Sequence, residues 1–176
     1  MRTLRIPLLV VVLAAALALV VAAERSHGAT AKLDEHLAVK AIRRYRATTV
    51  RLRHVMGGRA RGLTLAEGTS LERAHTIWRR RAVKLRRRFV AGPPHRGAWL
   101  CIHRYEGSWS DTGAPYYGGL QMDISFQQTY GSLLLRLKGT ADRWTPLEQM
   151  WIAEKAYRSG RGFYPWPNTA RACGLI

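Results

Sequence analysis

The residue best suited to act as an acid or a base is Glu106, which stands in the segment Tyr105-Glu106-Gly107-Ser108-Trp109. Cleavage of a glycosidic bond needs a carboxylic acid that stays protonated near neutral pH. Aromatic neighbours can supply the necessary environment, because burial disfavours the charged form of a carboxyl group and raises its pKa. The glutamate also falls at the end of a predicted helix, where its side chain could point into a cleft. On these features alone, a solvated surface glutamate is the more ordinary interpretation.

A second cluster suited to ligand binding is Tyr116-Tyr117-Gly118-Gly119-Leu120-Gln121. Glycine has no side chain, so the Gly118-Gly119 pair would let the backbone approach a ligand closely. Tyr117 offers an aromatic face on which a sugar could stack, and Gln121 offers amide hydrogen bonds. From the spacing alone, an aromatic-rich hairpin without a ligand is the favoured interpretation.

The two clusters belong to an ordered succession of motifs. The succession is Trp99-Leu100-Cys101, Glu106-Gly107-Ser108-Trp109, Tyr116-Tyr117-Gly118-Gly119-Leu120-Gln121-Met122, Glu148-Gln149 with Ala153-Glu154, and Trp166-Pro167 followed by Cys173. It resembles the resuscitation-promoting factors, which are actinobacterial transglycosylase-like domains with a small lysozyme-like fold. The resemblance covers about residues 96–175 and depends mainly on the Tyr-Tyr-Gly-Gly-Leu-Gln block. It implies that Glu106 is the catalytic acid of an enzyme that cuts the glycan strands of peptidoglycan.

The resemblance also implies a glycan-binding groove. Its expected residues are Tyr117, Gln121, Ser125, Gln149 and Trp166. Tyr117, Gln121 and Gln149 match family positions directly, whereas Ser125 stands where the family commonly has threonine.

The mechanism that the resemblance implies uses a single glutamate. Two-carboxylate glycosidases need a second acidic residue that faces the scissile bond, and the nearby candidates, Asp111 and Asp123, match no nucleophile position of the family. Glu106 would protonate the leaving oxygen and then act as a base. If it takes a proton from the muramic-acid 6-hydroxyl, the product is a 1,6-anhydro sugar. If it activates water, the reaction is lysozyme-type hydrolysis, and the sequence leaves both outcomes open.

The chain departs from the family pattern around the glutamate. The family usually has a cysteine directly before the catalytic glutamate, whereas Cys101 precedes Glu106 by five positions. The usual Ser-Gly-Gly-Asn-Trp is shortened to Gly107-Ser108-Trp109, and Cys173 lies further beyond Trp166 than usual. A Cys101–Cys173 disulfide between the first helix of the domain and the C-terminal tail is still expected. The shortened loop keeps an alternative open, a non-catalytic cell-wall glycan-binding or signalling module with a lysozyme-like fold.

The N-terminus predicts export. Arg2 and Arg5 precede a run from residue 8 to 23 that contains only Leu, Val and Ala, and small-residue sites follow at Val21-Ala22-Ala23 and Ala29-Thr30-Ala31. This is the three-part pattern of a secretory signal peptide. Residues 1–31 are therefore expected to be a cleaved signal peptide or, alternatively, an N-terminal anchor. In both cases the rest of the chain is expected to be secreted or at the cell wall.

Residues 32–94 are predicted to form a basic helical hairpin. Residues 32–91 carry 17 Lys and Arg against four acidic residues, in a chain whose net charge is +18. Apolar spacing predicts a helix over residues 33–56, stopped by Gly57-Gly58. A second helix is expected to begin at Thr69, where Thr69 and Glu72 fit a capping box, and to end before Pro93-Pro94.

The charge of this segment indicates an anionic partner. Two interpretations are equally compatible with the pattern. Residues 32–91 could dock on an anionic wall polymer or a membrane surface, or they could be a simply solvated helix face. A membrane-tethered basic interaction protein is a third functional hypothesis. Nucleic acid is not expected as a partner, because the chain is expected to be exported.

Residues 95–176 are expected to be the lysozyme-like domain, so the predicted fold class is mainly α: an α+β lysozyme-like small domain preceded by a basic helical hairpin. Helices are expected at 98–106, at 123–137 with a break near Gly131, and at 146–158, where Thr145, Pro146 and Glu148 form a capped start. Residues 109–120 are expected to form a loop or hairpin, and residues 163–167 an extended segment. The six histidines lack the spacing of a zinc protease, so neither a metal nor a cofactor is expected.

Overall fold

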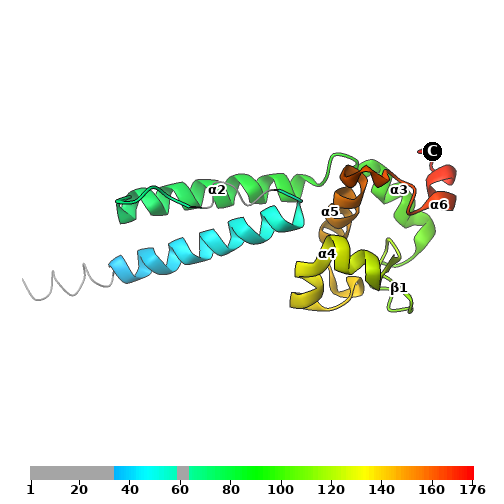
Figure 1. The fold of residues 1–176 in the computed structure, drawn as a ribbon, viewed down its shortest axis with the longest axis horizontal. Coiled ribbons are helices and arrows are strands. Elements are labelled where there is room, and N and C mark those ends of the chain that lie inside the picture. Colours follow the sequence, from blue (N-terminus) through cyan, green and yellow to red (C-terminus); the bar gives the residue numbers. More distant parts are fainter. Residues whose placement is uncertain (1–33, 59–63) are drawn as a thin grey trace, which may run out of the picture.

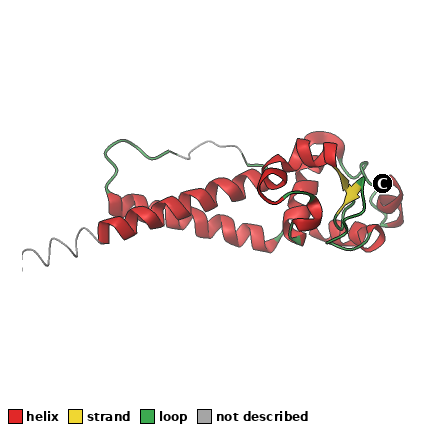
Figure 2. Ribbon diagram, turned by 90° about the horizontal axis from the view of Figure 1, so that it is seen from below, coloured by secondary structure: helices red, strands yellow, loops and turns green. Residues whose placement is uncertain are grey.

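The computed structural model describes residues 34–58 and 64–176, which form a helical rod joined to a globular end (Figure 1). The helical rod consists of residues 34–58 and 64–91, and the globular end of residues 92–176. Seen from a perpendicular direction, the two rod helices still run side by side, and the small sheet lies in the globular end (Figure 2). The described residues are mostly helical with one two-stranded antiparallel sheet, which confirms the mainly α fold class.

The helical rod pairs the helical residues 34–55 with α2, which spans Leu71–Ala91. The first helix ends as predicted, since Gly57 has a φ of 72°, a left-handed conformation that favours glycine. The predicted capping box at Thr69 is wrong. The N-cap of α2 is Ser70, whose hydroxyl accepts a hydrogen bond from Arg73 N at 3.4 Å. Thr69 donates its own hydroxyl to Ala66 O at 2.6 Å, because it belongs to the turn before the helix.

The two rod helices pack through a narrow row of buried residues. Thr49 and Leu52 are buried on the first helix, and Ala74, Trp78 and Ala82 are buried on α2. The three α2 residues recur every four positions and therefore lie on one face of the helix. Many basic side chains occupy the other, exposed faces of the rod.

Within residues 92–176 the chain forms four α-helices and two short helical turns. The helices are α3 (Arg96–Glu106), α4 (Ile124–Lys138), α5 (Pro146–Ala156) and α6 (Pro167–Ala172), and the turns are η1 (Ala141–Arg143) and η2 (Tyr157–Arg161). The capping box of α5 is confirmed, because Thr145 Oγ1 accepts from Glu148 N at 3.3 Å while Glu148 Oε2 accepts from Thr145 N at 2.9 Å. The predicted break in α4 is also confirmed: Gly131 is non-helical, and a Cβ there would lie 2.3 Å from Trp144 Cη2.

Two helix boundaries differ by two residues from the sequence predictions, and one predicted segment is wrong. Helix α5 ends at Ala156 instead of residue 158, because the chain continues as η2. Helix α3 begins at Arg96, two residues earlier than expected. The predicted extended segment over residues 163–167 is wrong: turns lead into α6, a helix with no counterpart among the predicted elements. Pro167 occupies the first turn of α6, where its missing N–H costs no hydrogen bond. Ala170 of this helix is fully buried, so packing rather than length stabilises it.

The segment expected to be a loop or hairpin contains a small hairpin. Strand β1 (Tyr116–Tyr117) pairs with β2 (Met122–Asp123) in antiparallel register, with Tyr116 opposite Asp123 and Tyr117 opposite Met122. The turn between the strands includes Gly118 and Gln121, which both have positive φ, at 73° and 47°. The hairpin therefore turns tightly next to the C-terminal end of α3.

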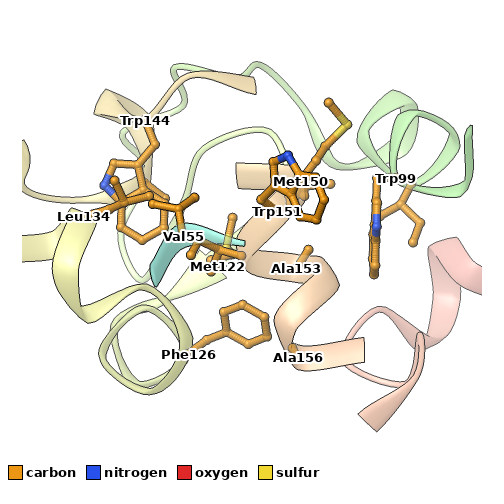
Figure 3. Close-up of a cluster of buried hydrophobic side chains, with 14 of the residues drawn as sticks. Val55, Trp99, Met122, Phe126, Leu134, Trp144, Met150, Trp151, Ala153 and Ala156 are labelled. Carbon is orange, nitrogen blue, oxygen red and sulfur yellow. The ribbon is translucent and has the colours of Figure 1, made fainter. Parts of the chain in front are cut away.

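The hydrophobic core is aromatic and includes residues from the helical rod. Trp99, Trp151 and Ile152 are essentially inaccessible, and Phe126 and Trp144 pack in the same cluster. Figure 3 shows Val55 of the rod among these side chains, close to Met122, Leu134 and Trp144. The base of the rod is therefore part of the core of the globular end.

In the parts of the chain that the structure describes, no helix has the length and apolar character needed to cross a membrane. The predicted signal peptide or anchor at residues 1–31 lies outside the described residues.

Candidate functional site

Glu106 is the last residue of α3, and its side chain is half-buried. The helix ends there because Gly107 adopts a φ of 129° and donates its N–H to His103 O. Thr169 Oγ1 donates a hydrogen bond to Glu106 Oε1 at 2.7 Å. Thr169 belongs to α6, the helix that was not predicted. It lies 63 positions after Glu106 in the sequence.

The disulfide joins the same two helices. Cys101 in α3 is bonded to Cys173 at the end of α6, with their Cα atoms 6.0 Å apart, which confirms the predicted pairing. This covalent link and the Thr169–Glu106 hydrogen bond both connect α3 to α6. The position of Thr169 relative to the carboxyl group is therefore constrained by a bond that does not depend on the hydrogen bond itself.

Gln121 and Asp111 form a pair next to the end of α3. Gln121 Nε2 donates to Asp111 Oδ2 at 2.8 Å and to Gly118 O at 3.0 Å. The other carboxylate oxygen of Asp111 accepts from Gly113 N at 3.0 Å. A Cβ on Gly107 would lie 3.6 Å from Asp111 Oδ2 and 3.9 Å from Gln121 Nε2. The structure thus brings Gln121 and Asp111 against the residue that follows Glu106.

Gln149 is fully buried beneath the hairpin. Its Nε2 donates to the carbonyls of Trp109 and Ala141, both at 2.8 Å, and to that of Trp144 at 3.1 Å. Its Oε1 is buried and has no hydrogen-bond partner among the described residues. A Cβ on Gly118 would lie 2.6 Å from this oxygen. Gln149 therefore supports the hairpin turn from within the protein.

The other predicted groove residues occupy three different environments. Trp166 is 5 % exposed, donates its indole N–H to Leu120 O at 2.7 Å and packs edge-on against Trp99. Tyr117 is half-buried in β1. Ser125 is exposed at the start of α4, where its hydroxyl donates to Asp123 Oδ1 at 2.7 Å. Two of the five predicted groove residues are linked to the surroundings of Glu106: Gln121 lies against Gly107, and the carbonyl of Trp166 is 3.4 Å from Thr169 Oγ1.

Asp123 serves as the N-cap of α4. Its carboxylate accepts from Phe126 N at 2.7 Å as well as from Ser125. The backbone hydrogen bond from Phe126 is the largest influence that lowers the pKa of Asp123, followed by the hydrogen bond from the Ser125 hydroxyl. Asp111 and Asp123, the two carboxylates considered as partners of Glu106, are thus both engaged in holding local backbone structure.

The Gly118-Gly119 pair permits close approach, but to the protein's own side chains. A Cβ on Gly119 would lie 2.6 Å from His103 Nδ1 and 2.7 Å from Trp109 Cε3. The rings of His103 and Trp109 stack with centroids 3.8 Å apart, and His103 Nδ1 is 3.0 Å from Gly119 O. This stack, like Thr169, was missed from the sequence. The two glycines were the available signal, because they indicated that something must pack there.

Among the described residues, no group of three or more His, Cys, Asp or Glu side chains is arranged to hold a metal ion. Compared with protein-family models, with curated proteins and with solved structures, the chain matches none. Its function must therefore be inferred from the residues around Glu106.

Proposed function

We propose that the chain is an exported enzyme with a lysozyme-like domain that cleaves the glycan strands of peptidoglycan, with Glu106 as its acid and base. The observation that carries this proposal is the 2.7 Å hydrogen bond from Thr169 to Glu106 Oε1 at the place where α3, α6 and the hairpin turn meet. A half-buried carboxyl group with one oxygen already oriented is suited to deliver a proton from its other oxygen.

The chemistry follows from that orientation. With Oε1 accepting the Thr169 hydrogen bond, the acidic proton resides on Oε2 of Glu106, which transfers it to the glycosidic oxygen as the bond breaks. The resulting carboxylate then removes a proton from the muramic-acid 6-hydroxyl or from water. The Thr169 hydroxyl donates to Oε1, so it holds the carboxyl group in place while Oε2 gives up and regains the proton. Thr169 is thus proposed as a positioning residue.

The engagement of the two aspartates supports a single-glutamate mechanism. Both oxygens of Asp111 accept hydrogen bonds, from Gly113 N and from Gln121 Nε2. The carboxylate of Asp123 caps α4. A nucleophilic carboxylate would have to leave such bonds to reach the sugar, whereas Glu106 needs no second carboxylate if the attacking group is the substrate's own hydroxyl or a water molecule.

The test is digestion of polymeric peptidoglycan by the purified, oxidised protein, followed by mass spectrometry of the released muropeptides. Glu106→Gln should reduce the rate by a factor of at least about 100, the usual contribution of a general acid. Anhydro-muropeptides from the wild type would identify a transglycosylase, and reducing-end products a muramidase. Equal rates for the wild type and Glu106→Gln would contradict the proposal.

Two further variants examine the surroundings of the acid. Thr169→Val removes the hydroxyl with little change of volume and should slow turnover by about tenfold, the value of one hydrogen bond to a charged group. Gln121→Ala should weaken turnover without unfolding the domain, and unchanged turnover would remove Gln121 from the site. Thr129→Val is the matched control, because it removes the hydroxyl of an exposed threonine of α4 that donates to Ser125 O.

A non-catalytic glycan-binding or signalling module is the second candidate. The observation in its favour is that Gln121 Nε2 is occupied by Asp111 and Gly118, and that the glycine pair packs on internal side chains. In that case the folded, oxidised wild type and Glu106→Gln would both be inactive while both retained binding to glycan strands in a sedimentation assay.

A further inference from the structure

A strongly cationic pocket lies where the helical rod meets the globular end. It has a volume of about 570 Å³. Five of its lining side chains are basic: Arg53, Arg81, Lys84, Arg88 and Arg158. None of the described residues that line it is acidic. These side chains come from the first rod helix, from α2 and from η2, so the pocket exists only in the folded chain.

Aromatic rings hold two of these arginines in place. The Arg81 guanidinium lies over the Trp78 ring at 4.9 Å, and that of Arg88 lies over the Trp151 ring at 5.9 Å. Stacking on an indole orients a guanidinium but leaves its N–H donors available. Arg81 Nη1 is buried and has no hydrogen-bond partner among the described residues. Buried donors are normally satisfied in a folded protein, so this nitrogen indicates an acceptor other than the described residues.

The buried carboxylate of Glu154 lies 3.8 Å from Arg158 of the pocket, and both of its oxygens have other partners. Glu154 is fully buried, accepts from Trp99 Nε1 at 3.0 Å, and has both oxygens 3.2 Å from His95 Nδ1. Its oxygen Oε1 is 3.8 Å from Arg158 Nε, a longer contact than either of those. Arg158 also donates to the carbonyls of Glu154 and Met56. The charge of the pocket is therefore only weakly compensated by Glu154.

Two basic groups beside the pocket have lowered pKa values. Burial is the largest influence that lowers the pKa of Lys155, and the charge of Arg158 lowers it further. Burial likewise lowers the pKa of His54, and the charges of Lys155 and Arg136 add to the effect. A Cβ on Gly57, the next residue but one after Val55, would lie 2.8 Å from Lys155 Cγ and 3.1 Å from Arg158 Nη2. Cationic groups thus crowd the edge of the pocket.

We propose that this pocket binds a compact polyvalent phosphate anion, such as a diphosphate group. Guanidinium forks match the paired oxygens of phosphate, and several converging arginines favour an anion with more than one negative charge. The volume is in the range of small-molecule sites and is ample for a diphosphate. The proposal concerns a place separate from Glu106 and does not depend on glycan cleavage.

The experiment is isothermal titration calorimetry of the full chain with inorganic pyrophosphate at low and at physiological salt. We expect saturable binding of one pyrophosphate per chain that weakens as salt is raised. The absence of saturable binding would overturn the proposal. Vesicles that contain phosphatidic acid provide a second arm: if these bind but pyrophosphate does not, the interaction is with a charged surface and the pocket is not a phosphate site.

A pair of double variants separates the pocket from general positive charge. Arg81→Gln with Arg88→Gln should raise the Kd for pyrophosphate by at least about tenfold, as loss of two charge-assisted contacts predicts. Arg80→Gln with Arg87→Gln removes the same charge from the same helix at exposed residues that do not line the pocket. This control should change the Kd by less than about threefold, since exposed charges at a distance are screened. Equal weakening by the two double variants would overturn the proposal.

A single substitution tests the pocket without the stacked arginines, whose loss could destabilise the fold. Lys84 is exposed and lines the pocket, so Lys84→Gln should weaken pyrophosphate binding with an unchanged midpoint of thermal unfolding. Arg86→Gln, two residues further along α2 and outside the pocket, is its control. If Lys84→Gln and Arg86→Gln had the same affinity as the wild type while the stacked-arginine variant was unfolded, the proposal would be rejected.

Discussion

The helical rod is held by a narrow row of buried side chains beneath a basic surface, whereas the globular end contains several buried indole rings, two buried glutamates and a disulfide. The two regions also differ in charge. Residues 32–91 carry 17 basic and four acidic residues, whereas residues 95–176 carry nine basic and six acidic residues. Large apolar residues such as Val50 and Val83 of the rod remain more than two-fifths exposed. The rod therefore exposes a charged surface, and the globular end contains most of the buried apolar side chains.

The two regions are nevertheless not independent. Val55 of the rod is 1 % exposed within the core of the globular end. Trp151 of α5 donates its indole N–H to Phe89 O of α2 at 3.1 Å, and Arg158 donates to Met56 O. The base of the rod is thus part of the same core as α5. A truncation that removed residues 32–91 would expose core side chains, so the role of the rod is better tested by point substitutions.

The largest expected effect is that of Trp99→Ala. Trp99 is fully buried, packs on Phe163 and Trp166, and donates to Glu154, so its loss should cost about 5 kcal/mol in the free energy of unfolding. Trp78→Ala, the matched change in the rod, should cost about 3 kcal/mol, because Trp78 lies outside the main core cluster. Urea denaturation measures both. Equal losses would show that the rod is packed as well as the globular end.

Removal of the disulfide should have the next largest effect. The bond closes a loop with a sequence separation of 72, for which loop-closure entropy predicts a loss of about 4 kcal/mol in Cys101→Ser with Cys173→Ser. Reduction of the wild type by dithiothreitol should give the same denaturation curve. Glycan cleavage should fall as well, since α6 carries Thr169. A loss below about 1 kcal/mol would mean that α6 docks without its covalent link.

Gly118→Ala should have an intermediate effect, about 2 kcal/mol. Gly118 is buried with a φ of 73°, and the new Cβ would lie 2.6 Å from Gln149 Oε1. Gly160→Ala is the control, because Gly160 also has a positive φ, 99°, but nothing within 4 Å of its Cβ position. That change should cost about 1 kcal/mol, the backbone strain alone. Thermal unfolding would show whether contact or backbone strain dominates.

The smallest loss in the free energy of unfolding is expected from substitutions at the helix caps. The stabilisation by the cap should depend on pH in the globular end but not in the rod. Asp123→Ala should cost about 1 kcal/mol near neutral pH. Because its pKa in the folded protein lies below the ordinary 3.8, this stabilisation should be complete above that value and be lost as the pH falls below it. Ser70→Ala at the N-cap of α2 should cost a similar or smaller amount at every pH, since its hydroxyl does not titrate. Denaturation midpoints at pH 3 and pH 7 would reveal the contrast.

Local sequence signals predicted the elements that local interactions stabilise. The capping box of α5 lies within four consecutive residues, Thr145 to Glu148, and the break in α4 follows from a single glycine. The error at Thr69 has the same local origin: Thr69 and Ser70 are both good caps, and which of them starts α2 depends on where the turn ends. The pairing of Cys101 with Cys173 was predictable because the chain has only these two cysteines.

The amino-acid sequence by itself determined the helical character, the concentration of basic residues in the rod, the disulfide and the choice of Glu106 as candidate acid, because these depend on composition, periodicity and motif order. The tertiary structure alone decided what surrounds that acid. Thr169 reaches Glu106 from a short helix whose stability comes from packing and from Cys173, and Gly118 and Gly119 accommodate Gln149 and His103. The cationic pocket likewise forms where segments of the rod and the globular end that are distant in sequence pack together. A local sequence pattern cannot predict such packing.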